Sequence, residues 1–210
     1  MEADFHHVSV LPEETVNGLL TDANGVYVDC TLGGAGHAAR IVSRLSPQGR
    51  LVGIDQDTAA VAVAKERLRG ASPRIDIVHD NFRHLDHILR DLGVTAINGV
   101  LFDLGVSSYQ IDTAERGFSY MKDAPLDMRM DSRATLSAYE VVNGWDEAEL
   151  TRREAFYLPS DERMALSDFV LNNEGDLASL RREAEAIVRE VESRGFLNRC
   201  VRTNIGEGGK

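Results

Sequence analysis

The sequence has only two cysteines, Cys30 and Cys200, and no apolar run of the roughly 20 residues that a membrane helix needs. Two cysteines so far apart match neither a disulfide framework nor a zinc site, so we expect reduced thiols and no metal centre. The first residues, MEADFHHVSVLPEE, lack the basic and apolar regions of a signal peptide. These absences predict a soluble protein of the cytoplasm that does not bind a membrane.

Basic residues are also few: the chain has 23 Lys and Arg against 34 Asp and Glu, which gives a net charge of -11. This balance argues against nonspecific coating of DNA, which needs a basic face. It does not exclude a nucleic-acid substrate, because a local basic patch can lie on an acidic protein. With 43% hydrophobic residues in a chain of 210, the composition is that of a globular protein with one sizeable domain, alone or with an appendage.

From residue 26 onward, strand and helix patterns alternate. Apolar runs predict strands at 26–30, 50–55, 75–80 and 97–105, and helical spacing predicts helices at 37–45, 57–69 and 85–93. Repeated βα units with nearly continuous apolar strands indicate a parallel sheet covered on both faces. Right-handed crossovers then predict an α/β fold with a doubly wound, Rossmann-like sheet and the strand order 3-2-1-4. An apolar fourth strand at an edge favours self-association, so a homodimer is possible.

Each predicted strand ends at or near an acidic residue; these are Asp29, Asp55, Asp80 and Asp103. An isolated acid at such a position is usually a turn former or a helix cap, as expected for Asp57 at the start of the second helix. In open parallel sheets, however, ligands bind outside the carboxyl ends of the strands. Four acids at successive strand ends therefore favour a binding site at this rim.

The stretch DCTLGGAGHAAR, residues 29–40, places three glycines and a histidine between a strand and a helix, a general site for nucleotide-like ligands. Its glycines, Gly33, Gly34 and Gly36, do not have the G-x-G-x-x-G spacing, and the chain contains no Gly-Lys-Ser/Thr phosphate loop. A nucleoside without pyrophosphate fits better, and S-adenosylmethionine is such a ligand. Asp55 lies 22 residues after Gly33, near the roughly 20 expected for a carboxylate that binds ribose.

Beyond residue 105 the pattern changes. In residues 106–131 the apolar residues follow neither the helical nor the strand spacing. Connections of this length are commonly functional. Residues 135–150 predict a short helix, a break at Asn143-Gly144 and a second helix from Asp146. Two further helices are expected at 161–171 and 176–194, the latter with an apolar stripe. We expect a Rossmann-like domain at 1–110, the start of a helical substrate-recognition region at 111–150, and a divergent helical tail at 151–210.

Several stretches together resemble the bacterial small-subunit ribosomal RNA cytosine-N4 methyltransferases: HVSVLPEETV, DCTLGGAGH, GIDQD, NF, LFDLGVSSYQID, RGFSY and APLDMRMD. The resemblance covers about residues 6–150, and the pairing of FDLGVSSYQID with APLDMRMD is far more specific than a lone glycine loop. It implies a class I methyltransferase sheet, incomplete here. It also implies an enzyme that uses S-adenosylmethionine to methylate the exocyclic amine of a cytidine in small-subunit RNA.

The resemblance implies that the cofactor is bound by Ala35, Gly36, His37, Asp55, Phe82, Asp103 and Gln110. The residues themselves indicate the loop, with Gly33 and Gly34, and the strand-end acids Asp55 and Asp103. Gln110 comes from the resemblance alone. Asp103 begins the turn where the methyl group is expected, so it is the candidate catalytic residue. His37 either accepts a proton or hydrogen-bonds the loop or ligand.

The chain departs from the family at one position of the loop. Members typically carry Gly-Gly-His where this chain has Ala35-Gly36-His37. If residue 35 needs a positive φ, alanine costs about 1 kcal/mol or more. This departure bears on the affinity for the cofactor more than on the identity of the family.

Side chains suited to RNA follow residue 105. Aromatic residues can stack an unpaired base, and basic residues can meet phosphates. The main candidates are Arg116, Tyr120 and Arg129, accompanied by Tyr109, Phe118, Lys122 and Arg133.

Two other functions stay open. The match fades after Leu150, and residues 158–188 resemble the C-terminal segment of bacterial dephospho-coenzyme A kinases, without a kinase phosphate loop. A truncated or fused chain that binds cofactor or ribosome without catalysis is one alternative. The other is an NAD-dependent oxidoreductase on a Rossmann sheet, against which the glycine spacing argues.

Overall fold

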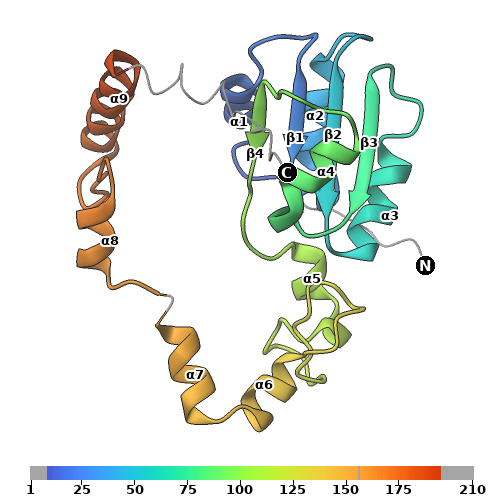
Figure 1. Ribbon diagram of the computed structural model, residues 1–210, viewed down its shortest axis with the longest axis vertical. Helices are drawn as coiled ribbons and strands as arrows, with labels where there is room; N and C mark the ends of the chain where they lie inside the picture. The colour runs from blue at the N-terminus through green and yellow to red at the C-terminus, as the bar shows by residue number, and fades with distance from the viewer. Residues whose placement is uncertain (1–8, 156, 195–210) are drawn as a thin grey trace, which may run out of the picture. The chain divides into compact units, whose positions relative to one another are not determined.

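The computed structural model of the protein describes residues 9–155 and 157–194 (Figure 1). The chain divides into two compact units, the first ending at Gly144 and the second beginning at Trp145. In these described ranges, no helix has both the length and the apolar character that crossing a membrane requires. Cys200 and the His7-Val8 start of the first family stretch lie outside the described residues.

A parallel sheet forms the centre of the first unit. Its order is β3-β2-β1-β4, which confirms the predicted order. The strands are β1 (Val26–Asp29), β2 (Arg50–Asp55), β3 (Arg74–His79) and β4 (Gly99–Leu101). Val28 of β1 lies opposite Val52 of β2 and Val100 of β4, so the carboxyl ends of all strands meet at one rim.

Helices cover both faces of this sheet, as a doubly wound fold requires (Figure 1). They are α1 (Pro12–Leu19), α2 (Gly36–Arg44), α3 (Thr58–Arg67) and α4 (Leu85–Asp91). Because side chains alternate along a strand, Tyr27 belongs to a buried cluster with residues of α1, α2 and α3. Its neighbour Val28 belongs to a second buried cluster with Ile88 of α4. The sheet therefore lies between two buried apolar clusters, one on each face.

The fourth strand is shorter than the sequence predicts. A strand over 97–105 is wrong, because β4 ends at Leu101 and the chain then leaves the sheet. Among the described residues, β4 pairs only with β1. Phe102 and Leu104 are 44% and 70% exposed, so the apolar character that suggested a longer strand lies partly on the surface.

Helix α1 is absent from the sequence prediction, although its signals are present. Leu11 has a left-handed conformation, Pro12 occupies the first turn, and Glu13 and Glu14 follow it, which is favourable at a helix start. Val16 is fully buried, and Glu13 pairs with Arg40 and Arg44 of α2. The helix thereby places residues 9 and 10 against the start of α2.

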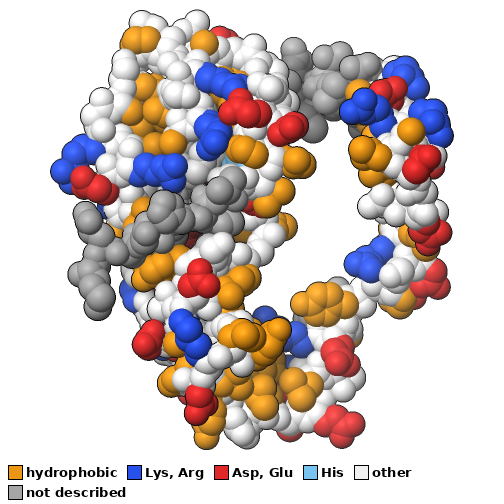
Figure 2. Space-filling model, turned by 180° about the vertical axis from the view of Figure 1, so that it is seen from behind, with side chains coloured by type: hydrophobic (Ala, Val, Ile, Leu, Met, Phe, Trp, Pro, Cys, Tyr) orange, Lys and Arg blue, Asp and Glu red, His pale blue; other side chains and the backbone are white. Residues whose placement is uncertain are grey.

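Residues 106–144 complete the first unit with little regular structure. They contain α5 (Ser108–Asp112), the 3-10 turn η2 (Ala114–Arg116) and α6 (Ala138–Gly144). Around α6, Leu136, Tyr139 and Val142 are 44%, 59% and 69% exposed, and Figure 2 shows hydrophobic side chains on the surface in the lower part of its view.

The second unit is helical. It contains α7 (Glu147–Glu154), which Asp146 caps as predicted, α8 (Ser160–Leu166) and α9 (Leu177–Ser193). The predicted helix at 161–171 is wrong at its end, because α8 stops at Leu166. The predicted helix at 176–194 is confirmed within one residue at each end.

Candidate active site

A cavity of about 430 Å³ lies at the carboxyl ends of the strands, within the roughly 300–1,000 Å³ typical of ligand pockets. The glycine loop forms one wall, and the turn after β4 forms the opposite wall. The structure brings all but one of the predicted cofactor residues to this cavity: Gly33, Gly34, Gly36, His37, Asp55, Phe82, Asp103 and Gln110. The exception is Ala35, which is fully buried beneath the loop.

The glycine loop turns back through two left-handed residues. Gly33 has a φ of 48° and Ala35 a φ of 59°, and the Ala35 N–H donates to the Leu32 carbonyl at 2.7 Å. The positive φ considered for residue 35 is therefore present, and alanine bears its cost of about 1 kcal/mol. A side chain at Gly36 would clash, since a Cβ there would lie 2.0 Å from the Ser9 hydroxyl.

Asp55 is tied to the glycine loop by both of its carboxylate oxygens. Oδ2 accepts the Gly33 N–H at 2.7 Å, and Oδ1 accepts the Asp57 N–H at 2.9 Å. Burial raises the pKa of Asp55, although these backbone donors oppose the shift. The carboxylate is thus held at the cavity wall, with lone pairs left for a ligand hydroxyl.

A polar chain connects the end of β1 with the opposite wall. Asp29 Oδ1 accepts the Thr31 N–H at 3.1 Å, and the Thr31 hydroxyl accepts the Asp103 N–H at 2.8 Å. The Asp103 carboxylate then lies 3.8 Å from His37 Nδ1, while His37 Nε2 lies 3.0 Å from the Val10 carbonyl. Because a carbonyl can only accept, Nε2 carries a proton and Nδ1 faces Asp103.

Of the four strand-end acids, Asp29 does not reach the cavity. It is 1% exposed, whereas Asp55, Asp80 and Asp103 line the wall. Burial raises the pKa of Asp29 to about 6. Asp29 ends β1 at the rim, but it does not line the site as expected, because its carboxylate is buried and accepts the Thr31 N–H.

The far end of the cavity combines an aromatic ring with polar groups. Phe82 packs edge-on against Phe102, with ring centroids 5.5 Å apart. The Asp80 carboxylate accepts a hydrogen bond from His84 at 2.9 Å, which lowers the pKa of Asp80. Asn81, between Asp80 and Phe82 in the sequence, also lines the wall. A flat ring with amide and carboxylate groups beside it can hold a heteroaromatic base.

The charge of the cavity is one-sided. Its charged side chains are Asp55, Asp80 and Asp103, and none of the described residues that line it is Lys or Arg. An acidic wall repels phosphates and attracts cations. The site therefore suits a ligand with a positive centre and no pyrophosphate.

The wall opposite the loop is built by a capping box. The Ser107 hydroxyl accepts the Gln110 N–H at 3.2 Å, and Gln110 Oε1 accepts the Ser107 N–H at 2.9 Å. Gln110 Nε2 then donates to Asp57 Oδ2 at 2.9 Å. Residues that sequence reasoning missed at the cavity include Ser9, Thr31 and Met130. For Asp57 the cap was predicted, but no local spacing indicates a partner 53 residues away.

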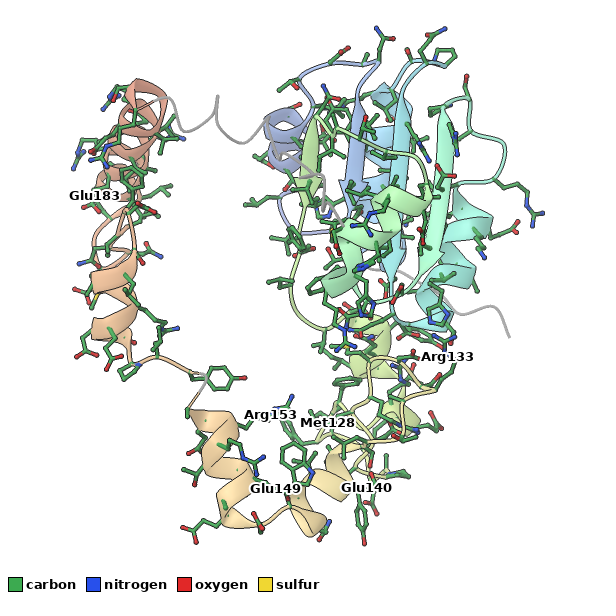
Figure 3. All side chains as sticks on the ribbon, viewed as in Figure 1. Met128, Arg133, Glu140, Glu149, Arg153 and Glu183 are labelled. Atoms are coloured by element: carbon green, nitrogen blue, oxygen red, sulfur yellow. The ribbon has the colours of Figure 1, made fainter. Side chains whose placement is uncertain are left out.

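The arginines proposed to meet RNA are engaged within the chain. Arg116 donates to Asp57 and to two backbone carbonyls, and Arg129 donates to Asp127 and to the Ala134 carbonyl. Arg133 lies near the end of β3, where its Nη2 is 3.1 Å from His79 Nε2 (Figure 3). Tyr120 is 96% exposed. Contacts of these residues with RNA remain predictions. Tyr120 is the better candidate for such a contact than Arg116, because its ring is exposed and the Arg116 guanidinium is bonded within the chain.

The strand order and the rim cavity define a Rossmann-like α/β domain with its ligand site at the carboxyl ends of the strands. The model of the MraW methylase family matches residues 4–166. The chain belongs to the MraW methylase family. The resemblance seen in the motifs is thereby confirmed, and the match extends beyond Leu150 into α8.

Two curated relatives carry the name "Ribosomal RNA small subunit methyltransferase H". The one from Brevibacillus brevis is 57% identical over 148 residues, which cover 70% of this chain and 47% of that protein. The one from Clostridium botulinum strain Kyoto is 45% identical over 207 residues, 96% of this chain and 61% of that protein. The chain thus spans about half to three fifths of their length. The second alignment includes most of the tail, so the tail is not wholly unlike the family.

One solved structure in the comparison is an rRNA methylase from Streptococcus thermophilus. It is 24% identical, with a TM-score of 0.36 over 44% of this chain and 51% of that chain. A likeness this slight supports no argument about the site.

Proposed function

We propose that the chain is an S-adenosylmethionine-dependent methyltransferase that modifies N4 of a cytidine in small-subunit ribosomal RNA. The observation that carries the proposal is the acidic cavity, which has no basic lining residue in the described structure. Membership of a methylase family implies a methyl donor. Among nucleoside ligands, S-adenosylmethionine carries positive charge at its sulfur and amino group, and it lacks pyrophosphate.

The donor set of the cavity fits this ligand. Asp55 is placed to accept the ribose hydroxyls, because its oxygens are fixed by Gly33 and Asp57. Phe82 and Asn81 are placed to flank the adenine ring. The backbone N–H groups at the start of α2, from Gly36 onward, have no intrahelical partners and suit the carboxylate.

The chemistry needs orientation and a proton acceptor more than a strong acid. When bound, the cofactor supplies a methyl group on a positively charged sulfur. Transfer forms an N–C bond, breaks the S–C bond and leaves one proton to be removed from the amine. We assign Asp103 to accept a hydrogen bond from the amine, because its carboxylate is 39% exposed at the cavity and its backbone is held by Thr31. Proximity and orientation supply much of the acceleration in such a site.

A ribosomal substrate accords with the predicted cytoplasmic location and with a partner that is RNA. The exposed edge at β4 is compatible with the predicted homodimer. An alternative role is binding of the cofactor without catalysis.

The deciding measurement is methyl transfer from labelled S-adenosylmethionine to small ribosomal subunits that lack the modification. We expect label in one cytidine of the RNA. Calorimetry with NADH serves as the comparison for an oxidoreductase, and we expect no binding of NADH. If S-adenosylmethionine binds and no label is transferred, the catalytic proposal fails for this chain and only cofactor binding remains.

The ribose assignment is tested with Asp55→Asn. Asn keeps an oxygen for the Gly33 N–H but loses the charge and the oxygen that accepts the Asp57 N–H, so we expect the affinity for S-adenosylmethionine to fall about tenfold or more. Asp86→Asn, an exposed acid of α4 away from the cavity, is the matched control and leaves the affinity unchanged. Equal affinities for wild type and Asp55→Asn would show that another group binds the ribose.

A further inference from the structure

Asp57 is a buried carboxylate that joins three parts of the first unit. Its side chain is 4% exposed. Oδ1 caps α3 by accepting the Ala59 N–H at 3.0 Å. Oδ2 accepts Gln110 Nε2 at 2.9 Å and Arg116 Nη1 at 2.6 Å. A helix cap needs only the first of these contacts, so the second oxygen serves something other than α3.

The contacts of Gln110 show what the second oxygen holds. Both ends of its amide are used inside the protein, with Oε1 accepting from Ser107 and Nε2 donating to Asp57. Gln110 is 6% exposed and lines the cavity together with residues 103–107. Asp57 therefore fixes the turn after β4 at its far end.

Arg116 extends the same anchor into the following loop. Its Nη2 donates to the carbonyls of Arg129 and Met130, at 2.8 and 3.2 Å, and its own carbonyl accepts the Met128 N–H. Met130 lines the cavity. The guanidinium group thus connects a buried carboxylate to a loop 13 residues further along the chain.

On its other side, Asp57 is bonded to the ribose end of the site. Its N–H donates to Asp55, which in turn accepts the Gly33 N–H. The glycine loop, the strand-end acid and the opposite wall are therefore linked in one continuous series of hydrogen bonds.

We propose that Asp57 is a positioning residue, which holds the outer wall of the cavity, residues 105–110 and 130, in its binding position through Gln110 and Arg116. The assignment rests on the proposed function, because the wall matters only if the cavity takes S-adenosylmethionine. Asp57 is not among the residues that line the cavity. Its contribution is to fix the wall that does.

The test uses Asp57→Asn, because Asn keeps an oxygen that caps α3 but replaces Oδ2 with an NH2 group, which cannot accept from Gln110 or Arg116. Arg116→Met removes the other partner. Asp76→Asn is the matched control, because Asp76 also pairs with a buried arginine, Arg50, but on strands away from the cavity. All proteins are compared at a temperature where circular dichroism shows them folded.

Hydrogen exchange gives the readout that needs no ligand. We expect backbone amides of residues 105–130 to exchange about tenfold faster in Asp57→Asn and Arg116→Met, with β1 and β2 unchanged. We expect the affinity for S-adenosylmethionine to fall about tenfold in both variants. Asp76→Asn leaves both quantities as in the wild type.

The double variant separates positioning from mere stability. Asp57→Asn combined with Arg116→Met leaves no unpaired buried charge, so its melting temperature recovers relative to the single variants. If Asp57 positions the wall, the affinity stays weak in the double variant, because nothing holds residues 105–110 and 130.

Recovery of affinity together with stability would overturn the proposal, as would unchanged hydrogen exchange in residues 105–130. Failure of the wild type to bind S-adenosylmethionine would instead refute the proposed function, and the exchange data would still decide the positioning role.

Discussion

Aspartates in two regions of the first unit respond to their surroundings in opposite ways. At the strand ends, burial raises the pKa of Asp29 to about 6 and also raises that of Asp55. In the loop after α5, hydrogen bonds from neighbouring arginines lower the pKa of Asp127 and lower that of Asp131 to about 2. Folding thus disfavours the ionised form of the aspartates at the strand ends, whereas it favours the ionised form of those in the loop.

The same contrast appears in the packing. Fully buried apolar side chains of the strands pack against helices on both faces of the sheet, with Tyr27 and Leu51 in one cluster and Val28 and Val52 in the other. Residues 113–134 hold together mainly through arginines that contact carboxylates and backbone carbonyls, and Met121 is 76% exposed. The sheet that carries the site is stabilised by exclusion of water, whereas residues 113–134 are stabilised by directed polar contacts.

The largest effect is expected from Leu51→Ala, which removes a fully buried side chain of β2. Such substitutions cost about 2–5 kcal/mol of unfolding free energy, since a cavity is left behind. Met121→Ala, in the polar loop, is expected to change it by less than about 0.5 kcal/mol. Urea unfolding of both variants measures the difference. Similar losses for the two would contradict the division into an apolar sheet and a polar loop.

Asp29→Asn is expected to stabilise the protein at neutral pH. The folded chain keeps the Asp29 proton up to about pH 6, and the unfolded chain releases it near 3.8, so the unfolding free energy falls as the pH rises between these values. Asn does not titrate and escapes this loss, which is at most about 3 kcal/mol. The gain over wild type therefore grows from pH 4 to pH 6 in urea unfolding. A gain that is the same at pH 4 and pH 7 would refute the assignment to Asp29.

A smaller effect than that of Asp29→Asn is expected from Asp131→Asn, with the opposite pH dependence. Asp131 pairs with Arg133 at 2.9 Å, but the arginine side chain is 62% exposed. The pair contributes about 0.2–1 kcal/mol, fully present above pH 4 and lost as the pH falls towards 2. Unfolding at low and high salt measures it, since salt screens exposed charges. A loss independent of salt would indicate that the amide disturbs the loop rather than the ion pair.

Local patterns predicted the sheet well because strand and helix periods are properties of neighbouring residues. They failed where tertiary contacts decide, as at β4, where apolar residues after Leu101 leave the sheet. In the site, the glycine loop and Asp55 follow from spacing, whereas Gln110 required the family resemblance. Neither route indicated that Arg116 pairs with Asp57, because partners 59 residues apart leave no periodic signal. Nor could spacing reveal that the Asp29 carboxylate is buried and does not line the cavity.

Ala35 has a consequence for how a ligand meets the glycine loop. Its methyl group is fully buried and its N–H is bonded to Leu32, so its left-handed conformation is established when the sheet folds. The energetic cost of that conformation is therefore met once, during folding, and is not subtracted from each binding event. Despite its glycines, the loop is a preorganised receptor. Conformational changes that accompany ligand binding and release are then expected in the opposite wall. We therefore expect that wall to set the rates of ligand association and dissociation.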